Sequence, residues 1–114
     1  MPDYTNLGYT NEPDYTAGVS ATSGYTATEK CWLRAYTSGD GASKQAGEAV
    51  VYVNGIRVVG ARVSQWTYQT INEILVPLDI GDVVTTYVNL GTAALTIFPM
   101  KTDKITSTYC IKYI

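Results

Sequence analysis

The sequence of 114 residues contains no histidine, and charged residues make up only 16% of it. Histidine is the commonest general base and metal-binding side chain, so this sequence lacks the residue on which many catalytic and metal sites depend. The eight Lys and Arg residues are scattered along the chain, and the net charge is −2. A nucleic-acid-binding surface needs clustered positive charge, so we expect no nucleic acid partner.

Long apolar runs are also missing. No stretch of about 18 apolar residues occurs, so we expect no membrane insertion. Residues 1–6 have neither the basic region nor the apolar segment of a signal peptide, and no Asn-x-Ser/Thr sequon is present. We therefore expect a protein that works inside a cell or leaves it by another route, such as within a virus particle.

Cysteine occurs twice, at positions 31 and 110. Cys31 alternates with Leu33 and Ala35 along a predicted strand, which indicates that its side chain points into the core. On the predicted strand 106–114, Cys110 lies on the opposite face from Tyr109 and Ile111, which indicates that its side chain points away from the core. We therefore expect two free thiols and not a disulfide.

Short strand patterns make up most of the chain, with 46% hydrophobic residues in total. No window has a 3.6-residue period, so we expect almost no helix, and many short strands indicate an antiparallel sandwich or barrel. A domain of this size buries roughly two-thirds of its unfolded surface. The expected strands are residues 17–22, 25–28, 31–38, 48–53, 56–63, 64–70, 74–78, 83–88, 93–100 and 106–114.

Two turns have clear sequence signatures. Asn54-Gly55 between β-branched runs predicts a hairpin with a type I′ turn, and Gly60 in the return strand predicts a bulge. Residues 79–82 predict a second hairpin between the strands 74–78 and 83–88, with Gly81 at positive φ. Pro77 cannot donate to a ladder, which places it at a sheet edge or strand end.

Residues 1–16 form a polar segment that precedes the predicted sandwich domain of residues 17–114. The sequence Pro-Asp-Tyr-Thr occurs twice in it, at 2–5 and 13–16. One interpretation is a solvated extended arm. The other is an arm that docks on a neighbouring subunit, because tyrosines provide contact area at small entropic cost; Tyr4, Tyr9 and Tyr15 are the candidate contacts.

Four motifs, taken in order, resemble modules of bacteriophage fibres. Residues 24–33 (GYTATEKCWL) resemble the entry to their jelly roll, and residues 51–56 (VYVNGI) resemble their Val-x-Val-Asn-Gly hairpin. Residues 78–84 (LDIGDVV) resemble a Gly-Asp strand pair that is also found in jelly rolls of the tumour-necrosis-factor and C1q type. Residues 97–101 (IFPMK) resemble the last motif of short prophage-encoded fibre proteins.

The resemblance implies an all-β, antiparallel jelly-roll-like sandwich of about eight to ten short strands, preceded by an extended N-terminal arm. It also implies a virion component, assembled in the bacterial cytoplasm and often trimeric, without catalytic residues to transfer. A chain that opens directly on the module suits a head-fibre, decoration or tail-associated protein. Other virion proteins and a host-surface glycan are the expected partners.

Residues that could support catalysis or hold a metal ion lack the partners that such sites need. Without histidine, Cys31 and Cys110 have no obvious base, and no Ser-x-x-Lys is present. Asp79 and Asp82 suit a turn better than a calcium site, because their spacing fits no EF-hand loop. Gly39-Asp40-Gly41 lacks the Gly-Lys-Ser/Thr ending of a phosphate loop. We expect no enzyme, no metal and no cofactor.

The aromatic residues support two binding hypotheses. The first is a subunit interface of a virion protein, and the second is a sugar-stacking platform of a carbohydrate-binding module. The second is weakened because Gln65 and Gln69 alternate with Trp66 and so point away from it. Aromatic enrichment with few charges favours a self-associating protein, and the resemblance points to a trimer. The candidate contacts are Trp32, Tyr36, Trp66 and Tyr68.

Overall fold

The structure, a computed structural model, describes residues 9–40, 46–64 and 69–102. This part of the chain contains nine strands and one short 3-10 turn, and no helix in it is long and apolar enough to cross a membrane. The elements are β1 (Tyr9–Pro13), η2 (Tyr15–Ala17), β2 (Val19–Ala21), β3 (Tyr25–Thr26), β4 (Cys31–Gly39), β5 (Gly47–Val53), β6 (Ile56–Val63), β7 (Thr70–Leu78), β8 (Val83–Asn89) and β9 (Gly91–Thr102).

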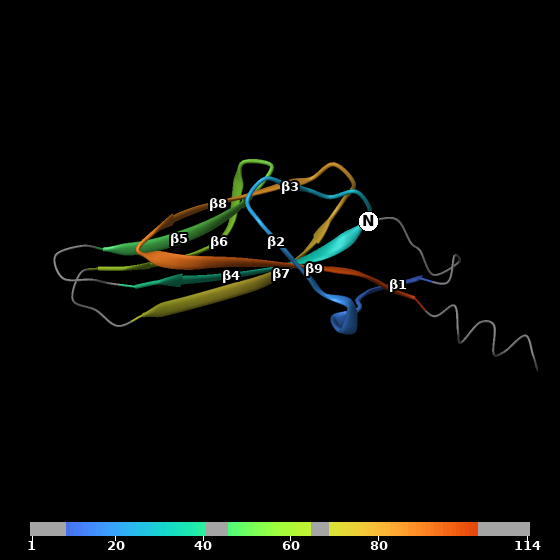
Figure 1. The fold of residues 1–114 in the computed structure, drawn as a ribbon, viewed down its shortest axis with the longest axis horizontal. Helices are drawn as coiled ribbons and strands as arrows, with labels where there is room; N and C mark the ends of the chain where they lie inside the picture. Colours follow the sequence, from blue (N-terminus) through green and yellow to red (C-terminus); the bar gives the residue numbers. More distant parts are fainter. Residues whose placement is uncertain (1–8, 41–45, 65–68, 103–114) are drawn as a thin grey trace, which may run out of the picture.

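The strands form two antiparallel sheets that lie face to face (Figure 1). The first sheet has the order β1-β9-β4-β7, with β2 also paired to β9, and the second has the order β3-β8-β5-β6. From β2 to β9 the first strand pairs with the last, the second with the second-last, and so on inward. This nesting is the topology of an eight-stranded jelly roll, so the predicted fold class is confirmed.

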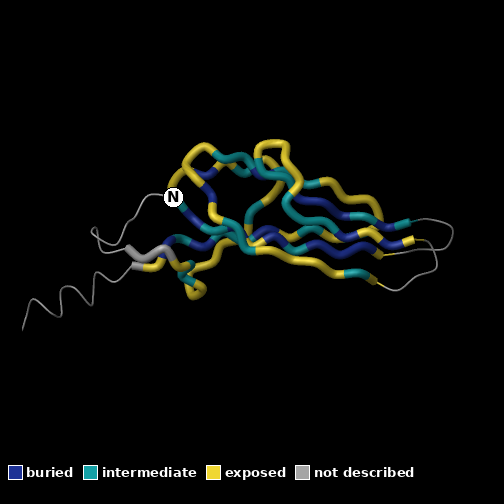
Figure 2. The backbone as a smooth tube through the Cα atoms, turned by 180° about the vertical axis from the view of Figure 1, so that it is seen from behind, coloured by how far each residue is buried: buried dark blue, intermediate teal, exposed yellow. Residues whose placement is uncertain are grey.

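The core lies between the two sheets and is built from alternate residues of the central strands. Leu33 and Ala35 of β4 are fully buried, and so are Val51 of β5 and Val84 of β8. Buried positions follow the middle of both layers in Figure 2, while the loops are exposed. Burying one aliphatic side chain of this size contributes about 1.5–3 kcal/mol. The period-two pattern of the sequence therefore sets the inner face of each strand.

The Asn54-Gly55 hairpin is confirmed. Asn54 (φ 52°) and Gly55 (φ 78°) both have positive φ, as a type I′ turn requires, and they join β5 to β6. The bulge lies two residues before the predicted position. Val51 pairs with Val59 and Tyr52 pairs with Arg57, so Val58 is the extra residue, while Gly60 pairs normally with Val50.

The turn at residues 79–82 is not the hairpin that we predicted. β7 pairs with β4 in the first sheet, whereas β8 pairs with β3 and β5 in the second, so the turn carries the chain from one sheet to the other. The turn chemistry itself is as expected: Gly81 has φ 91°, and the Asp82 carboxylate accepts a hydrogen bond from the Asp79 amide at 2.8 Å. Aspartate and glycine signal a tight turn, but they do not determine which strands pair.

Glycines bring the two sheets together at the opposite end of the sandwich. A Cβ on Gly47 would overlap the carbonyl oxygens of Asp40 and Leu90, and one on Gly91 would overlap that of Ser38. A Cβ on Gly39 would lie 2.9 Å from the Gly47 oxygen. The Asp40 amide also donates to the Leu90 carbonyl at 2.9 Å. Only residues without a side chain allow the two sheets to approach this closely.

Several boundaries differ from the prediction. β2 begins at Val19, because Asp14 caps the 3-10 turn Tyr15–Ala17 just before it. β1 falls within the predicted arm and pairs with β9, from Tyr9 opposite Thr102 to Pro13 opposite Met100. β7 begins at Thr70, so Ser64 and Gln69 are not in a strand as predicted. The rest of the predicted strand 64–70 and the whole strand 106–114 lie outside the described residues.

Pro77 lies near the end of β7, which is the outer strand of the first sheet. Its Cα pairs with Trp32 of β4, and its other side faces no strand of the sheet. The predicted edge position is therefore confirmed, and a missing amide donor costs the ladder little there.

Candidate functional site

The outer face of the first sheet carries the candidate aromatic residues of β4. Leu33, Ala35 and Thr37 point into the core, so Trp32 and Tyr36 point outward and are partly exposed. This confirms the alternation that placed both rings on one face. Arg34 lies between them on the same face, with its side chain about half exposed.

Neighbouring strands extend this face on both sides of β4. Across β7, Leu75 pairs with Arg34 and Glu73 pairs with Tyr36, while Ile71 continues the row and is 52% exposed. Across β9, Phe98 pairs with Trp32. An antiparallel sheet commonly presents a polar face to water. This face also carries Thr92 and Thr96 of β9, but aromatic and aliphatic side chains surround the Arg34–Glu73 ion pair. We call these residues the outer β4 face: Trp32, Arg34, Tyr36, Ile71, Glu73, Leu75 and Phe98.

Tyr15 reaches this face from the N-terminal segment. Its ring meets Phe98 edge to face, with centroids 5.2 Å apart and an interplanar angle of 67°. Gly18 lies so close to the Phe98 ring that a Cβ there would be 2.6 Å from a ring carbon. The segment therefore covers Phe98, which is 6% exposed although it points out of the sandwich. Tyr15 itself remains 64% exposed.

Asp14 holds the turn that carries Tyr15. Its carboxylate accepts hydrogen bonds from the Thr16 amide at 3.1 Å and from the Thr16 hydroxyl at 2.6 Å. These two bonds, the side-chain one first, lower the pKa of Asp14 from its ordinary value of 3.8. The ionised form of Asp14 therefore stabilises the turn.

An ion pair forms the polar centre of the outer β4 face. Arg34 donates from Nε and Nη2 to one Glu73 carboxylate oxygen, at 3.1 and 2.9 Å. A hollow of about 300 Å³ lies beside the pair, lined by Tyr15, Arg34, Glu73, Ile74 and Leu75. It therefore combines an exposed ring with groups that can donate and accept hydrogen bonds.

The structure brings together three of the candidate contacts, Trp32, Tyr36 and Tyr15. Tyr4, Trp66 and Tyr68 lie outside the described residues, as does the side chain of Tyr9. Sequence reasoning missed Phe98, Leu75 and the Arg34–Glu73 pair. Their only signal was the outward half of each strand alternation, and that pattern cannot show which strands are neighbours.

A second aromatic surface, on the outer face of the other sheet, was also missed. Tyr87 of β8 is 49% exposed and pairs with Val50 of β5, which is only 3% exposed although it points outward. Arg57 pairs with Tyr52 across the hairpin, and its guanidinium lies against Gly60. These side chains cover Val50 and so extend the apolar interior beyond the sandwich core.

The loops at the Asn54 end of the sandwich are held by polar contacts. Lys30 forms an ion pair with Asp79, and Asn54 Nδ2 donates to Asp82 at 2.9 Å. The turn interpretation of the two aspartates is therefore confirmed. Within the described ranges, no three His, Cys, Asp or Glu side chains are grouped so that they could hold a metal ion.

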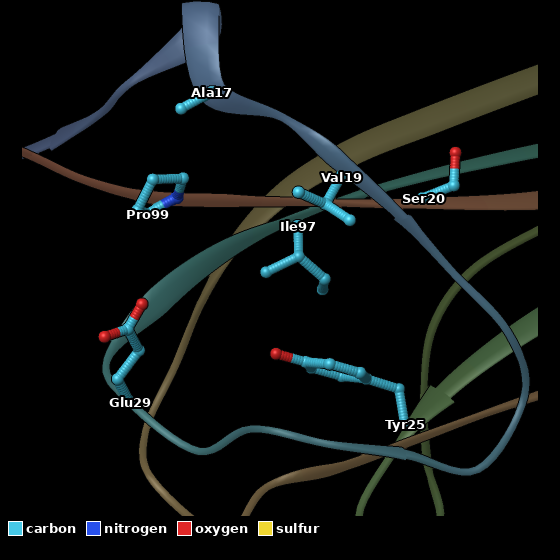
Figure 3. A pocket seen from close by; sticks show the side chains of 7 residues that line it. All are labelled: Ala17, Val19, Ser20, Tyr25, Glu29, Ile97 and Pro99. Carbon is cyan, nitrogen blue, oxygen red and sulfur yellow. The ribbon is translucent and has the colours of Figure 1, made fainter.

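A cavity of about 290 Å³ opens between the two sheets beside the short strands β2 and β3 (Figure 3). Its lining includes the Tyr25 ring and the Glu29 carboxylate. Behind it Cys31 is buried, with the Tyr25 hydroxyl donating to its sulfur. Burial is the main cause that raises the pKa of both the Tyr25 phenol and the Cys31 thiol.

Together, the topology and the two faces define a jelly-roll-like β-sandwich with aromatic outer surfaces. No known family model matches the sequence, and no curated protein is significantly similar to it.

Proposed function

We propose that this protein is a non-enzymatic structural subunit of a bacteriophage virion, of the head-fibre, decoration or tail-associated kind. It acts by assembling into a homotrimer and by attaching to other virion proteins. The outer β4 face is the main surface of self-association. The proposal combines the jelly-roll-like fold with the resemblance of four motifs to fibre modules.

The observation that carries the proposal is the composition of the outer β4 face. Trp32, Tyr36 and Leu75 lie at its centre, and Ile71 extends it while remaining 52% exposed. Arg34 and Glu73, the charged residues of the face as defined above, form an ion pair and so neutralise each other. Interface cores are rich in aromatic residues and poor in charge, which is the composition found here.

The matched substitutions Ile71→Lys and Ile56→Lys test this assignment. Both isoleucines are exposed, at 52% and 70%, but Ile56 lies on the Asn54-Gly55 hairpin away from the outer β4 face. Light scattering and sedimentation should give the native mass of a trimer. Ile71→Lys should weaken association at least about tenfold, because a buried charge without a partner is costly, whereas Ile56→Lys should not.

Two results would contradict the proposal. One is a native protein that stays monomeric up to about 100 μM, which corresponds to an association free energy weaker than about 5.5 kcal/mol. The other is an Ile71→Lys variant that assembles as tightly as the native chain. Unchanged unfolding behaviour of both variants would show that neither substitution acts through the fold.

A carbohydrate-binding module is the second candidate function, and the hollow beside Tyr15 favours it. The exposed Tyr15 ring could stack on a sugar while Arg34 and Glu73 bond to its hydroxyl groups. Screening against glycans followed by calorimetry would test it. Tyr15→Ala should abolish binding, and Tyr87→Ala on the other sheet serves as the control. A host glycan bound by a trimeric protein would be compatible with both functions.

A further inference from the structure

The cavity beside β2 and β3 exists because the sandwich is not closed along this side. β2 spans only Val19–Ala21 and β3 only Tyr25–Thr26, and the two belong to different sheets. In Figure 3 the chain between them loops around the opening and leaves it accessible. The cavity therefore lies between the two sheets and is reached from the side of the molecule.

One part of the lining is apolar. Val19 of β2 pairs with Ile97 of β9, and the side chains of both point towards the cavity with Pro99 beside them (Figure 3). The side chain of Val19 points to the inner face of the sheet, as that of its partner Ile97 does, yet Val19 is 66% exposed. An exposed valine on an inner face leaves apolar surface that a ligand could cover.

The other part of the lining is polar and negative. The Glu29 carboxylate lies at one end of the cavity, and the Tyr25 hydroxyl points towards the space between Glu29 and Ile97 (Figure 3). Within the described ranges no ion pair involves Glu29, and the adjacent Lys30 is bound to Asp79 instead. Burial, and to a smaller extent the charge of Glu29, raises the pKa of the Cys31 thiol behind the cavity.

We propose that this cavity binds a lysine side chain presented by a partner polypeptide. The aliphatic stem would lie along Val19, Ile97 and Pro99, and the ammonium would bond to the Glu29 carboxylate and the Tyr25 hydroxyl. Lysine suits the site because it carries a compact charge on a long apolar stem.

The short edge strands support a polypeptide as the source of the ammonium. Within the described sheets β2 pairs only with β9, at Val19 to Ala21, so no strand covers the other edge of β2 where it lines the cavity. Unpaired strand edges readily accept an extended backbone. A partner segment could therefore lie along the rim of the cavity while its lysine enters. This inference does not depend on the virion proposal.

Methyl NMR titration with two capped amino acids tests the inference. N-acetyl-lysine-N-methylamide carries the proposed side chain, and N-acetyl-norleucine-N-methylamide has a similar apolar stem without the charge. The lysine probe should shift the methyl signals of Val19 and Ile97, with a dissociation constant in the millimolar range expected of so small a ligand. The norleucine probe should bind at least about fivefold more weakly, because it cannot form a charge-assisted hydrogen bond.

Two variants assign the binding to this cavity. Glu29→Gln should weaken the lysine probe at least about fivefold and leave the norleucine probe unchanged. Asp40→Asn is the matched control, because Asp40 is an exposed carboxylate at the other end of the sandwich. Val19→Thr should weaken both probes, because the nearly isosteric hydroxyl reduces the apolar surface. Native methyl dispersion in each variant verifies the fold.

The inference is overturned by equal affinity for the two probes, by unchanged lysine binding in Glu29→Gln, or by shifts confined to another surface. Absence of any shift at Val19 and Ile97 up to the solubility limit of the lysine probe overturns it as well. A peptide with one lysine in an extended sequence should bind more tightly than the capped residue. Equal affinity of the peptide and the capped residue would reject the polypeptide as the source.

Discussion

Asn54 and Asp82 join two turns that belong to different strand connections. Asn54 Nδ2 donates to Asp82 Oδ1 at 2.9 Å, and Asn54 Oδ1 accepts from the Val83 amide at 2.9 Å. The backbone of Asn54 also donates to the Val83 carbonyl at 2.8 Å. The hairpin between β5 and β6 is thereby fixed to the turn that carries the chain from one sheet to the other.

Asn54 has two roles, because its side chain forms hydrogen bonds and its backbone has positive φ, and two substitutions should separate them. Asn54→Gly keeps the positive φ but removes both side-chain hydrogen bonds, so we expect it to lower the free energy of unfolding by about 1–2 kcal/mol. Asn54→Ala should cost about 1 kcal/mol more, because alanine is strained at φ 52°. Urea unfolding measures both. Equal losses in the two variants would show that the turn conformation contributes nothing.

The glycine contacts between the sheets lead to a second prediction. Gly91→Ala would place a Cβ against the carbonyl oxygens of Ser38 and Glu48, which belong to the backbone and cannot easily move. We expect a loss of about 3 kcal/mol in the free energy of unfolding. Gly60→Ala meets only the exposed Arg57 side chain and should cost less than about 1 kcal/mol. Urea unfolding that ranks the two variants equally would contradict this account.

Acid should loosen the turn that carries Tyr15. The pKa of Asp14 in the folded state lies below its ordinary value of 3.8. The ionised carboxylate therefore stabilises the fold above pH 3.8, and this stabilisation is lost as the pH falls through the folded-state pKa. The Thr16 amide signal and the Tyr15–Phe98 ring contact, followed by NMR, should change together in this range. Asp14→Asn should make both independent of pH there. A native Thr16 signal that does not titrate would rule out the capping role.

The Cys31 thiol should react slowly in the native protein. It is 1% exposed, and burial raises its pKa above the ordinary 9.0, while the Tyr25 hydroxyl opposes this in part. At about pH 8, iodoacetamide should modify Cys31 only as fast as the chain opens, as measured by mass spectrometry, and quickly in urea. Because the folded pKa is raised, the stability that the neutral thiol provides is lost as pH rises through that value.

Cys31→Ala is the control for the alkaline effect. It removes the thiol titration and should reduce the loss of stability between pH 9.0 and the folded pKa, after allowing for the cavity that it creates. Rapid modification of native Cys31 would contradict its placement in the core. Cys31 is a free thiol in the structure, as the alternation along β4 predicted. Cys110 lies outside the described residues.

Local patterns in the sequence were sufficient for most of the described strands and for one hairpin, but not for β1. The alternation from Cys31 to Ser38 identified the inner and outer faces of β4, because a strand of a sandwich has only two sides. Asn54-Gly55 identified its hairpin, because few dipeptides accept positive φ at both positions. In both cases the signal and the structure involve the same few residues.

Pairing between distant strands could not be predicted in the same way. The Asp79–Asp82 turn has the composition of a hairpin turn, yet Leu78 pairs with Cys31 and Val84 pairs with Tyr25. The packing of Tyr15 on Phe98 is equally hidden, because it depends on the antiparallel pairing of β1 and β2 with β9. Contacts of this kind are set by the tertiary packing of the whole sandwich.

The nested strand pairing also predicts an order of folding. Among the strand pairs that the structure describes, only β5 and β6 are consecutive and joined by a short turn, with Val53 opposite Ile56. Val19, in contrast, must find Ile97 near the other end of the described chain. Closing long loops costs entropy before any contact repays it, so the central hairpin should form first and the outermost pair last. Such a chain should fold on the slow scale of milliseconds to seconds that is typical of β-sandwiches. During synthesis, β2 would have to wait for β9, because β9 is the last of the described strands to be made.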